Sequence, residues 1–217
     1  MSRIAVILSG CGVFDGSEIH EATATLLALD RAGADVTIAA PTGAQMHVVD
    51  HQAGEPVAGE TRDIRIESAR IARGPVADVA DLDARDFDAV ILPGGFGAAK
   101  NLCTFATSGA DCTVNGAVAA FIADMHAKGK VVGAMCIAPA LVAKVLGGHV
   151  KLTIGSDPGT AAALEAAGAT HVTADVDEIV VDEANRVVST PAYMLAGRIS
   201  EVFDGVEKLV KKVIDLC

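Results

Sequence analysis

Residues Lys130 to Pro139 read Lys-Val-Val-Gly-Ala-Met-Cys-Ile-Ala-Pro, and this stretch decides how the chain folds. Its apolar run from Val131 to Met135 predicts a buried strand, and the residues from Ala138 to Leu146 predict a helix. Cys136 stands at the sharp turn between them. Such a turn pushes a side chain out of the sheet, and the helix N-terminus behind it favours a thiolate. The stretch therefore predicts an α/β fold with a candidate nucleophile at the sheet edge.

The same alternation of strand and helix runs along most of the chain. Short apolar strands that alternate with helices form a doubly wound, mostly parallel sheet with helices on both faces. Two further strands flank a turn signal at Glu183 to Asn185, which predicts a small antiparallel hairpin added to this sheet. The polar segment from Gln45 to Val79 is expected to leave the sheet. No linker or repeat divides the 217 residues, so we expect a single domain over residues 1–217.

The predicted elements share clear apolar periodicity or continuous β-branched runs. The strands are expected at Arg3 to Leu8, Val36 to Ala40, Asp88 to Leu92, Val131 to Met135, Glu178 to Asp182 and Arg186 to Ser189, and the helices at Ile19 to Arg31, Asn115 to Lys128, Ala138 to Leu146 and Ala192 to Leu216.

Composition narrows the classes of function. Hydrophobic residues make up 51% of the chain and charged residues 21%, which is typical of a globular protein. The net charge of -11 argues against binding to nucleic acid or to an anionic membrane surface. The longest apolar run, Val131 to Ala143, is too short to span a bilayer and contains a proline. We therefore expect neither nucleic acid nor a membrane as its partner.

The five cysteines, at positions 11, 103, 112, 136 and 217, are odd in number and form no C-x-x-C pair. A disulfide framework or a zinc ribbon is therefore not expected, and free thiols in a reducing compartment are. His47 and His51 lack the helical context of a zinc site, and the loop from Gly10 to Gly16 only half matches a dinucleotide fingerprint. We expect a cytoplasmic protein without a metal or an organic cofactor.

Three loops should meet at the carboxyl ends of the strands, where open α/β sheets bind ligands. They are Ser9 to Glu21, Pro93 to Asn101 and Cys136 to Pro139. The backbone N–H groups of Gly94 and Gly95 could converge there on an oxyanion, together with the N–H of Ile137 that follows the cysteine. A buried structural cysteine and a merely tight glycine connection are the alternatives at these positions.

Glu18 and Glu21 lie three residues apart at the start of the first helix and share a face. Either could move protons beside a thiol, whereas compensation of the helix dipole accounts for one of them. His20 points elsewhere on this helix and is expected behind the site or at the surface. Cys11, in the glycine-rich loop, is expected to line the pocket. The spacing leaves the choice between the two glutamates open.

These motifs resemble those of the ThiJ/PfpI superfamily, within the class I glutamine-amidotransferase-like fold. The matching residues are Pro93-Gly94-Gly95, Ala134-Met135-Cys136 and a glutamate of the first helix. In that superfamily the glutamate precedes an Ala-Gly pair by about a dozen residues, which selects Glu21 over Glu18. More narrowly, the stretches Leu8 to Glu21, Pro93 to Asn101, Met135 to Pro139 and Thr190 to Leu195 are similar to ElbB-type proteins, also called enhancing lycopene biosynthesis or sigma cross-reacting proteins.

The resemblance implies a flavodoxin-like fold, a homodimer and a loose link to isoprenoid biosynthesis. It also implies a cofactor-free glyoxalase activity that converts glyoxal or methylglyoxal to glycolate or lactate. The sequence departs from the superfamily's proteases, which carry a histidine where Ile137 stands, and from its true amidotransferases, which carry a late His-x-Glu. Three hypotheses remain open: a glyoxalase, a thiol redox sensor or protein-protective module, and a small-molecule binding protein with a vestigial site.

Overall fold

A seven-stranded sheet in the order β10-β11-β7-β6-β1-β2-β5 forms the centre of the computed structural model, which describes residues 1–217. Only the β10–β11 pair is antiparallel; every other neighbouring pair is parallel. The strands are β1 (Arg3–Ile7), β2 (Asp35–Ala40), β3 (Val49–Asp50), β4 (Glu55–Pro56), β5 (Ala77–Asp78), β6 (Ala89–Leu92), β7 (Val131–Met135), β8 (Lys151–Leu152), β9 (Thr170–His171), β10 (Val180–Asp182) and β11 (Val187–Thr190).

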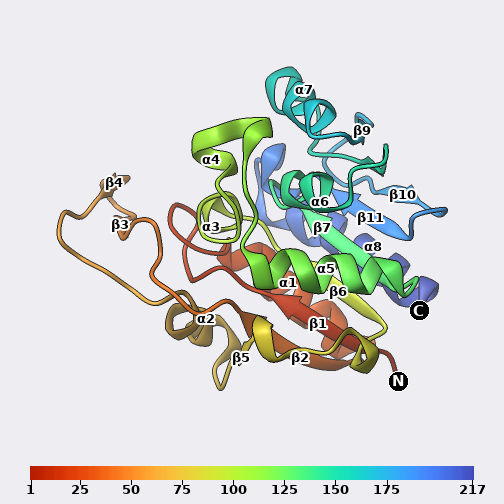
Figure 1. Ribbon diagram of the computed structural model, residues 1–217, viewed down its shortest axis with the longest axis horizontal. Helices are drawn as coiled ribbons and strands as arrows, with labels where there is room; N and C mark the ends of the chain where they lie inside the picture. The colour runs from red at the N-terminus through yellow and green to blue at the C-terminus, as the bar shows by residue number, and fades with distance from the viewer.

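Helices cover both faces of this sheet, with α5 and α6 in front and α1 and α8 behind in Figure 1. The α-helices are α1 (Ile19–Arg31), α2 (Ile64–Ala72), α3 (Phe96–Lys100), α4 (Phe105–Ser108), α5 (Gly116–Ala127), α6 (Pro139–Leu146), α7 (Pro158–Ala166) and α8 (Ile199–Leu216), and a 3-10 turn, η4, spans Ala192–Met194. None of them combines the length and the apolar character needed to cross a lipid bilayer. The predicted flavodoxin-like α/β class, with its antiparallel hairpin, is confirmed.

Buried, mostly small side chains explain the close packing of the layers. Every residue of β6 and β7 is buried, as expected for central parallel strands whose two faces are both covered. Two hydrophobic clusters result, one under α5 and α6 and the other under α1 and α8. Gly133 shows why small residues are needed: a Cβ there would lie 3.2 Å from Val213 and 3.3 Å from Leu209 of α8. The glycine therefore lets α8 pack directly against the sheet.

The structure differs from the sequence prediction mainly at the C-terminal helix and in the excursion. The helix begins at Ile199 instead of Ala192, because residues 192–194 turn back toward the sheet edge and Ala192 takes a positive φ of 45°. The polar excursion contains helix α2, the edge strand β5 and a β3–β4 hairpin that projects from the body as an arm on the left of Figure 1. Helix α7 and the β8–β9 pair had no clear periodic signal.

The topology also sets where a site can lie. From β1 the chain moves outward to β2 and β5, and it then returns to β6, on the other side of β1, before continuing to β7. The strand order thus reverses between β1 and β6, and ligands bind beyond the carboxyl ends of the strands at such a switch point. The register pairs Leu92 with Ala134 and Met135 with Thr190. The segments that follow β6, β7 and β11 therefore meet at this edge.

Candidate active site

Cys136 occupies the turn between β7 and α6 in a strained conformation. Its φ is +58°, a left-handed value that is unusual for a residue with a side chain. The turn is held because the Cys136 N–H donates to the Thr190 carbonyl at 3.1 Å, and the Ala138 N–H donates to the Met135 carbonyl at 3.0 Å. Backbone strain of this kind concentrates at functional sites. Cys136 is only 7% exposed, yet it contributes to the wall of a cavity.

Glu21 is the carboxyl group that meets this sulfur. It lies fully buried in the first turn of α1 and is within hydrogen-bonding reach of the Cys136 thiol. The Gly94 N–H donates to its Oε2 at 2.9 Å, and the Tyr193 N–H donates to its Oε1 at 3.1 Å. Burial, followed by repulsion from Glu18, raises the pKa of Glu21 from its ordinary value of 4.5 to about 7. This carboxyl can therefore take up and release a proton near neutral pH.

Glu18 has a different position from Glu21, although both were candidates. It is the N-cap of α1, and its Oε2 accepts the Glu21 N–H at 2.7 Å. It also contributes to the cavity wall, whereas Glu21 does not. Glu18 thus stabilises the helix that carries Glu21 and sets its charge environment.

The surroundings of Cys136 disfavour the thiolate that the sequence predicted. Burial, and then the Glu21 carboxylate, hold the pKa of Cys136 well above its usual range, and hydrogen bonds from the N–H groups of Gly95 and Ile137 lower it only in part. The expectation relied on a helix N-terminus, but α6 begins three residues later, at Pro139. Each of the two groups therefore affects the proton affinity of the other, and Glu21 is placed to accept the thiol proton from Cys136.

Two glycines make this close approach possible. A Cβ at Gly94 would lie 2.4 Å from the Cys136 Cβ and 2.9 Å from both the Cys136 sulfur and the Glu21 Oε2. A Cβ at Gly95, whose φ is +91°, would lie 2.3 Å from the Glu18 nitrogen. The N–H groups of Gly95 and Ile137 both reach the sulfur, so they converge where an oxyanion on an attached carbon would form.

A cavity of about 410 Å³ opens over Cys136. Its walls are mainly apolar and come from the loop after β1, from α3, α4 and α7, from the elbow and from η4. The lining residues are Val13, Glu18, Gly95, Phe96, Ala99, Phe105, Ala106, Cys136, Ile137, Thr160, Tyr193 and Met194. Phe96 lies in a loop that was predicted to meet the site. Phe105, Tyr193 and Met194 were not predicted to line it, since α4 and η4 are too short to give a periodic signal.

His20 and Cys11 do not line this cavity, which corrects the expectation for Cys11. The His20 Nδ1 lies 2.7 Å from the Tyr193 hydroxyl and 4.0 Å from a Glu18 oxygen, on the exposed side of α1. Cys11 lies in the glycine-rich loop near α2, where burial and then the Glu67 carboxylate raise its pKa. Its loop turns toward α2, and the pocket takes Val13 instead.

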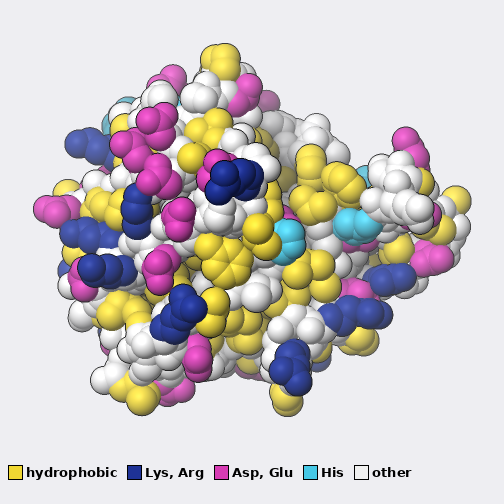
Figure 2. Space-filling view, turned by 180° about the vertical axis from the view of Figure 1, so that it is seen from behind, with side chains coloured by type: hydrophobic (Ala, Val, Ile, Leu, Met, Phe, Trp, Pro, Cys, Tyr) yellow, Lys and Arg dark blue, Asp and Glu magenta, His cyan; other side chains and the backbone are white.

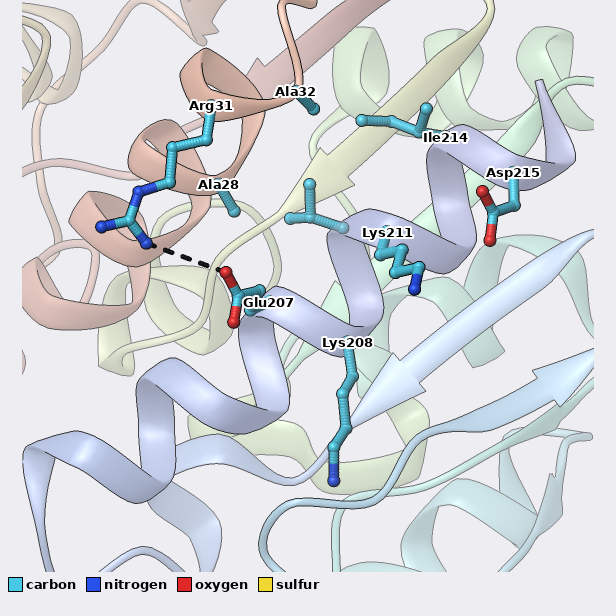
Figure 3. Close-up of a pocket in the computed structure, with 9 residues that line it drawn as sticks. Ala28, Arg31, Ala32, Glu207, Lys208, Lys211, Ile214 and Asp215 are labelled. Atoms are coloured by element: carbon cyan, nitrogen blue, oxygen red, sulfur yellow. Dashed lines mark ion pairs between the residues drawn. The ribbon is translucent and has the colours of Figure 1, made fainter.

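A second cavity, of about 550 Å³, lies between α1 and α8 on the rear of the molecule (Figure 3). Its rim carries charged side chains, including Arg31 and Glu207 at 3.7 Å from each other, and no cysteine or histidine lines it. Figure 2 shows this rear face, with acidic and basic side chains interspersed on the left and hydrophobic ones more frequent toward the projecting arm. The candidate catalytic residues therefore lie at the Cys136 cavity and not at this second one.

Comparisons with known proteins agree with this arrangement. The model described as the DJ-1/PfpI family matches residues 5–196. The chain is 50% identical to human "Glutamine amidotransferase-like class 1 domain-containing protein 3, mitochondrial", over 99% of this chain and 83% of the relative. It is 49% identical to rat "ES1 protein homolog, mitochondrial", over 99% of this chain and 84% of that protein.

Solved structures extend the similarity. An isoprenoid biosynthesis protein with an amidotransferase-like domain from Ehrlichia chaffeensis superposes with a TM-score of 0.92 at 35% identity. The match covers 99% of this chain and 100% of that protein. Glyoxalase III from Candida albicans has a TM-score of 0.62 at 16% identity, over 99% of this chain and 97% of that one, and shares the fold alone.

The names of the relatives overturn the cytoplasmic expectation. The human, rat and zebrafish proteins, which are 50%, 49% and 39% identical to this chain, are all mitochondrial. The expectation was wrong because free cysteines indicate a reducing environment without distinguishing one reducing compartment from another. Since the family model spans most of the chain and these relatives align with nearly all of it, the chain belongs to the DJ-1/PfpI family, in the branch of the ES1 and ElbB-type amidotransferase-like proteins.

Proposed function

We propose that the protein is a cofactor-independent glyoxalase that converts an α-oxoaldehyde to a 2-hydroxy acid. The observation that carries this proposal is the juxtaposition of the Cys136 sulfur and the Glu21 carboxyl, which meet at Gly94 below a mainly apolar cavity, with the N–H groups of Gly95 and Ile137 beside the sulfur. No histidine lines the cavity, and of the two glutamates Glu21 is the one that lies beside the sulfur, so we assign the role of base to it. A solved structure with the same fold is named glyoxalase III, and this supports the choice of reaction class.

The first step is the addition of sulfur to the aldehyde. Glu21 takes the thiol proton as the Cys136 sulfur attacks the aldehyde carbon, and the new oxyanion is held by the N–H groups of Gly95 and Ile137. The carboxyl then passes its proton to that oxygen, which gives a neutral hemithioacetal. A carboxyl with a pKa of about 7 suits both transfers, because its proton affinity lies near the working pH.

The second step moves a proton between the two carbons of the substrate. Glu21 removes the hydrogen of the former aldehyde carbon, and the electron pair of that C–H bond forms a C=C bond while negative charge develops on the former ketone oxygen. The hydroxyl proton of the hemithioacetal passes to this adjacent oxygen, which leaves an ene-diolate whose charge lies on the former aldehyde oxygen. Glu21 then returns its proton to the former ketone carbon as the thioester carbonyl forms, and water hydrolyses the 2-hydroxy thioester to the acid and the free thiol. The aldehyde carbon is oxidised and the ketone carbon reduced by the same amount, so the reaction needs only water as co-reactant.

The raised pKa of Cys136 favours this proposal over a peroxide sensor. Reaction with peroxide requires a thiolate at rest, and sensor cysteines lie in electropositive, partly exposed places. Cys136 is instead buried beside a carboxylate, which disfavours a thiolate at rest. Its proton can leave when Glu21 accepts it as the sulfur attacks a bound substrate. A binding protein with a vestigial site would likewise have no need of a carboxyl group placed to accept the proton of a thiol.

The test is turnover of methylglyoxal in deuterated water, followed by proton NMR of lactate. Cys136→Ser and Glu21→Gln should each lower kcat/KM by about 100-fold or more. The exposed Cys217→Ser and Glu207→Gln serve as matched controls and should keep wild-type rates. Solvent deuterium should enter carbon 2 of lactate, because the carboxyl proton exchanges with water.

Two results would refute the proposal. Full activity of Cys136→Ser would show that Cys136 is not the nucleophile. Complete retention of protium at carbon 2 would show that the reaction does not pass through an ene-diol. The homodimer implied by the family resemblance stays a prediction, which sedimentation equilibrium can test on the same samples.

A further inference from the structure

The size of the cavity over Cys136 exceeds what glyoxal or methylglyoxal can fill. Its volume is about 410 Å³, within the range of about 300–1,000 Å³ in which proteins bind drug-sized ligands. Methylglyoxal has five non-hydrogen atoms, and its two oxygens would face Cys136 and the N–H groups beside it. Most of the cavity wall would then stay in contact with water, and those wall residues would contribute nothing to substrate binding or to the rate.

The walls are apolar where the rest of a larger substrate would lie. Phe96 and Ala99 of α3, Phe105 and Ala106 of α4, and Met194 of η4 surround the space beyond the sulfur. The polar groups that line it, Glu18, Thr160 and the Tyr193 side chain, are few. An alkyl or ring substituent would therefore lose its contact with water against these walls, and its burial contributes free energy of binding. This binding energy increases the rate when the bound substituent positions the reacting carbon.

The charges around the cavity select against anionic substrates. No lysine or arginine lines it, whereas the Glu18 carboxyl does. Lys100, which is not part of the lining, is already engaged: its Nζ donates to the Phe14 carbonyl at 3.0 Å and lies 4.9 Å from the centre of the Phe96 ring. A carboxylate or phosphate on the substrate would be desolvated next to Glu18 without a partner.

We infer that the preferred substrates are uncharged α-oxoaldehydes with an apolar substituent larger than methyl, of the size of isobutyl or cyclohexyl. This inference rests on the proposed function. It names the substrate class for the same site and assigns the specificity to the apolar walls from α3, α4 and η4.

The test compares alkylglyoxals whose reacting groups are electronically alike. Isobutylglyoxal and cyclohexylglyoxal should show kcat/KM values about tenfold or more above that of methylglyoxal. The anion 4,5-dioxopentanoate, which has a chain of similar length to isobutylglyoxal, should fall about tenfold or more below isobutylglyoxal. Rates are taken as 2-hydroxy acid formed, with Cys136→Ala subtracted as the background.

A cavity-filling variant links the preference to the wall. Ala106→Leu adds volume at the α4 wall and should reduce the ratio of kcat/KM for cyclohexylglyoxal over methylglyoxal by about fivefold or more. Thr107→Leu is the matched control, since Thr107 is the next residue of α4, is exposed and does not line the cavity. It should leave the ratio at the wild-type value.

The outcomes separate this inference from the proposed function. Turnover that depends on Cys136 but has equal kcat/KM for methyl, isobutyl and cyclohexyl substrates would overturn the inference and leave the glyoxalase standing. A faster reaction with 4,5-dioxopentanoate than with isobutylglyoxal would also overturn it. Absence of Cys136-dependent turnover for every member of the series would overturn both.

Discussion

Replacement of Glu21 by glutamine should change how the stability of the protein depends on pH. The folded protein holds this carboxyl proton with a pKa of about 7, against an ordinary value of 4.5. Between these two pH values the unfolded chain has released the proton and the folded chain still binds it. The free energy of unfolding therefore falls as pH rises through this window, and the stability present below pH 4.5 is lost by about pH 7.

The size of the effect follows from the difference between the two pKa values. Each tenfold change in proton affinity is worth about 1.4 kcal/mol, so the change from 4.5 to about 7 corresponds to about 3 kcal/mol. Glutamine does not titrate and lacks this contribution. Its amide also cannot accept both N–H groups from Gly94 and Tyr193, which adds a cost that does not vary with pH.

Urea unfolding followed by circular dichroism at several pH values from 4.5 to 7.5 measures this difference directly. The free energy of unfolding of the wild type minus that of Glu21→Gln should fall by about 3 kcal/mol across the range. Glu207→Gln, at an exposed ion pair, should give a curve parallel to that of the wild type. Cys136→Ala should keep the pH dependence, because burial and Glu18 are the main causes of the raised pKa. A constant difference between wild type and Glu21→Gln would refute the reasoning.

Three further predictions concern activity. The kcat/KM for α-oxoaldehydes should rise with pH through an apparent pKa near 7, because Glu21 must be ionised to accept the thiol proton, and Glu21→Gln should lose this limb of the profile. Gly94→Ala should lower kcat/KM by about 100-fold or more, since its methyl group would overlap Cys136, whereas Gly116→Ala, with open space around it, should be near wild type in both activity and melting temperature. Tyr193→Phe should change kcat/KM by less than about threefold, because it keeps the backbone N–H that binds Glu21; a loss near that of Glu21→Gln would show that the phenol takes part.

Local sequence signals were strong enough to predict most of the central sheet. Continuous apolar runs fixed the positions of β1, β6 and β7, and α1 begins and ends where its periodicity and Gly33 indicated. The elbow at Cys136 could also be predicted, because an apolar strand that ends in small residues and meets a helix needs a tight turn. These features depend on residues that are close together in the sequence, so local patterns are enough to predict them.

Short or irregular segments were less accessible from the sequence. Residues 192–194 continue the helical periodicity of the C-terminal segment, yet they turn so that the Tyr193 N–H can bind Glu21. The cavity wall is built from α3 and α4, which have only 5 and 4 residues, and from parts of α7 and η4. Their contacts join positions that are tens of residues apart, and no local pattern encodes such contacts.

The sequence by itself determined the α/β class, the turn that carries Cys136 and the presence of two nearby glutamates. The family resemblance favoured Glu21 of the two, and only the tertiary structure gives the physical reason: the register of β6, β7 and β11 brings the N–H groups of Gly94 and Tyr193 onto Glu21 and leaves Glu18 as the helix cap. It also decided the ionisation of the site. The charge of a thiol or a carboxyl depends on the water, dipoles and charges that surround it, and distant parts of the chain supply these only after folding.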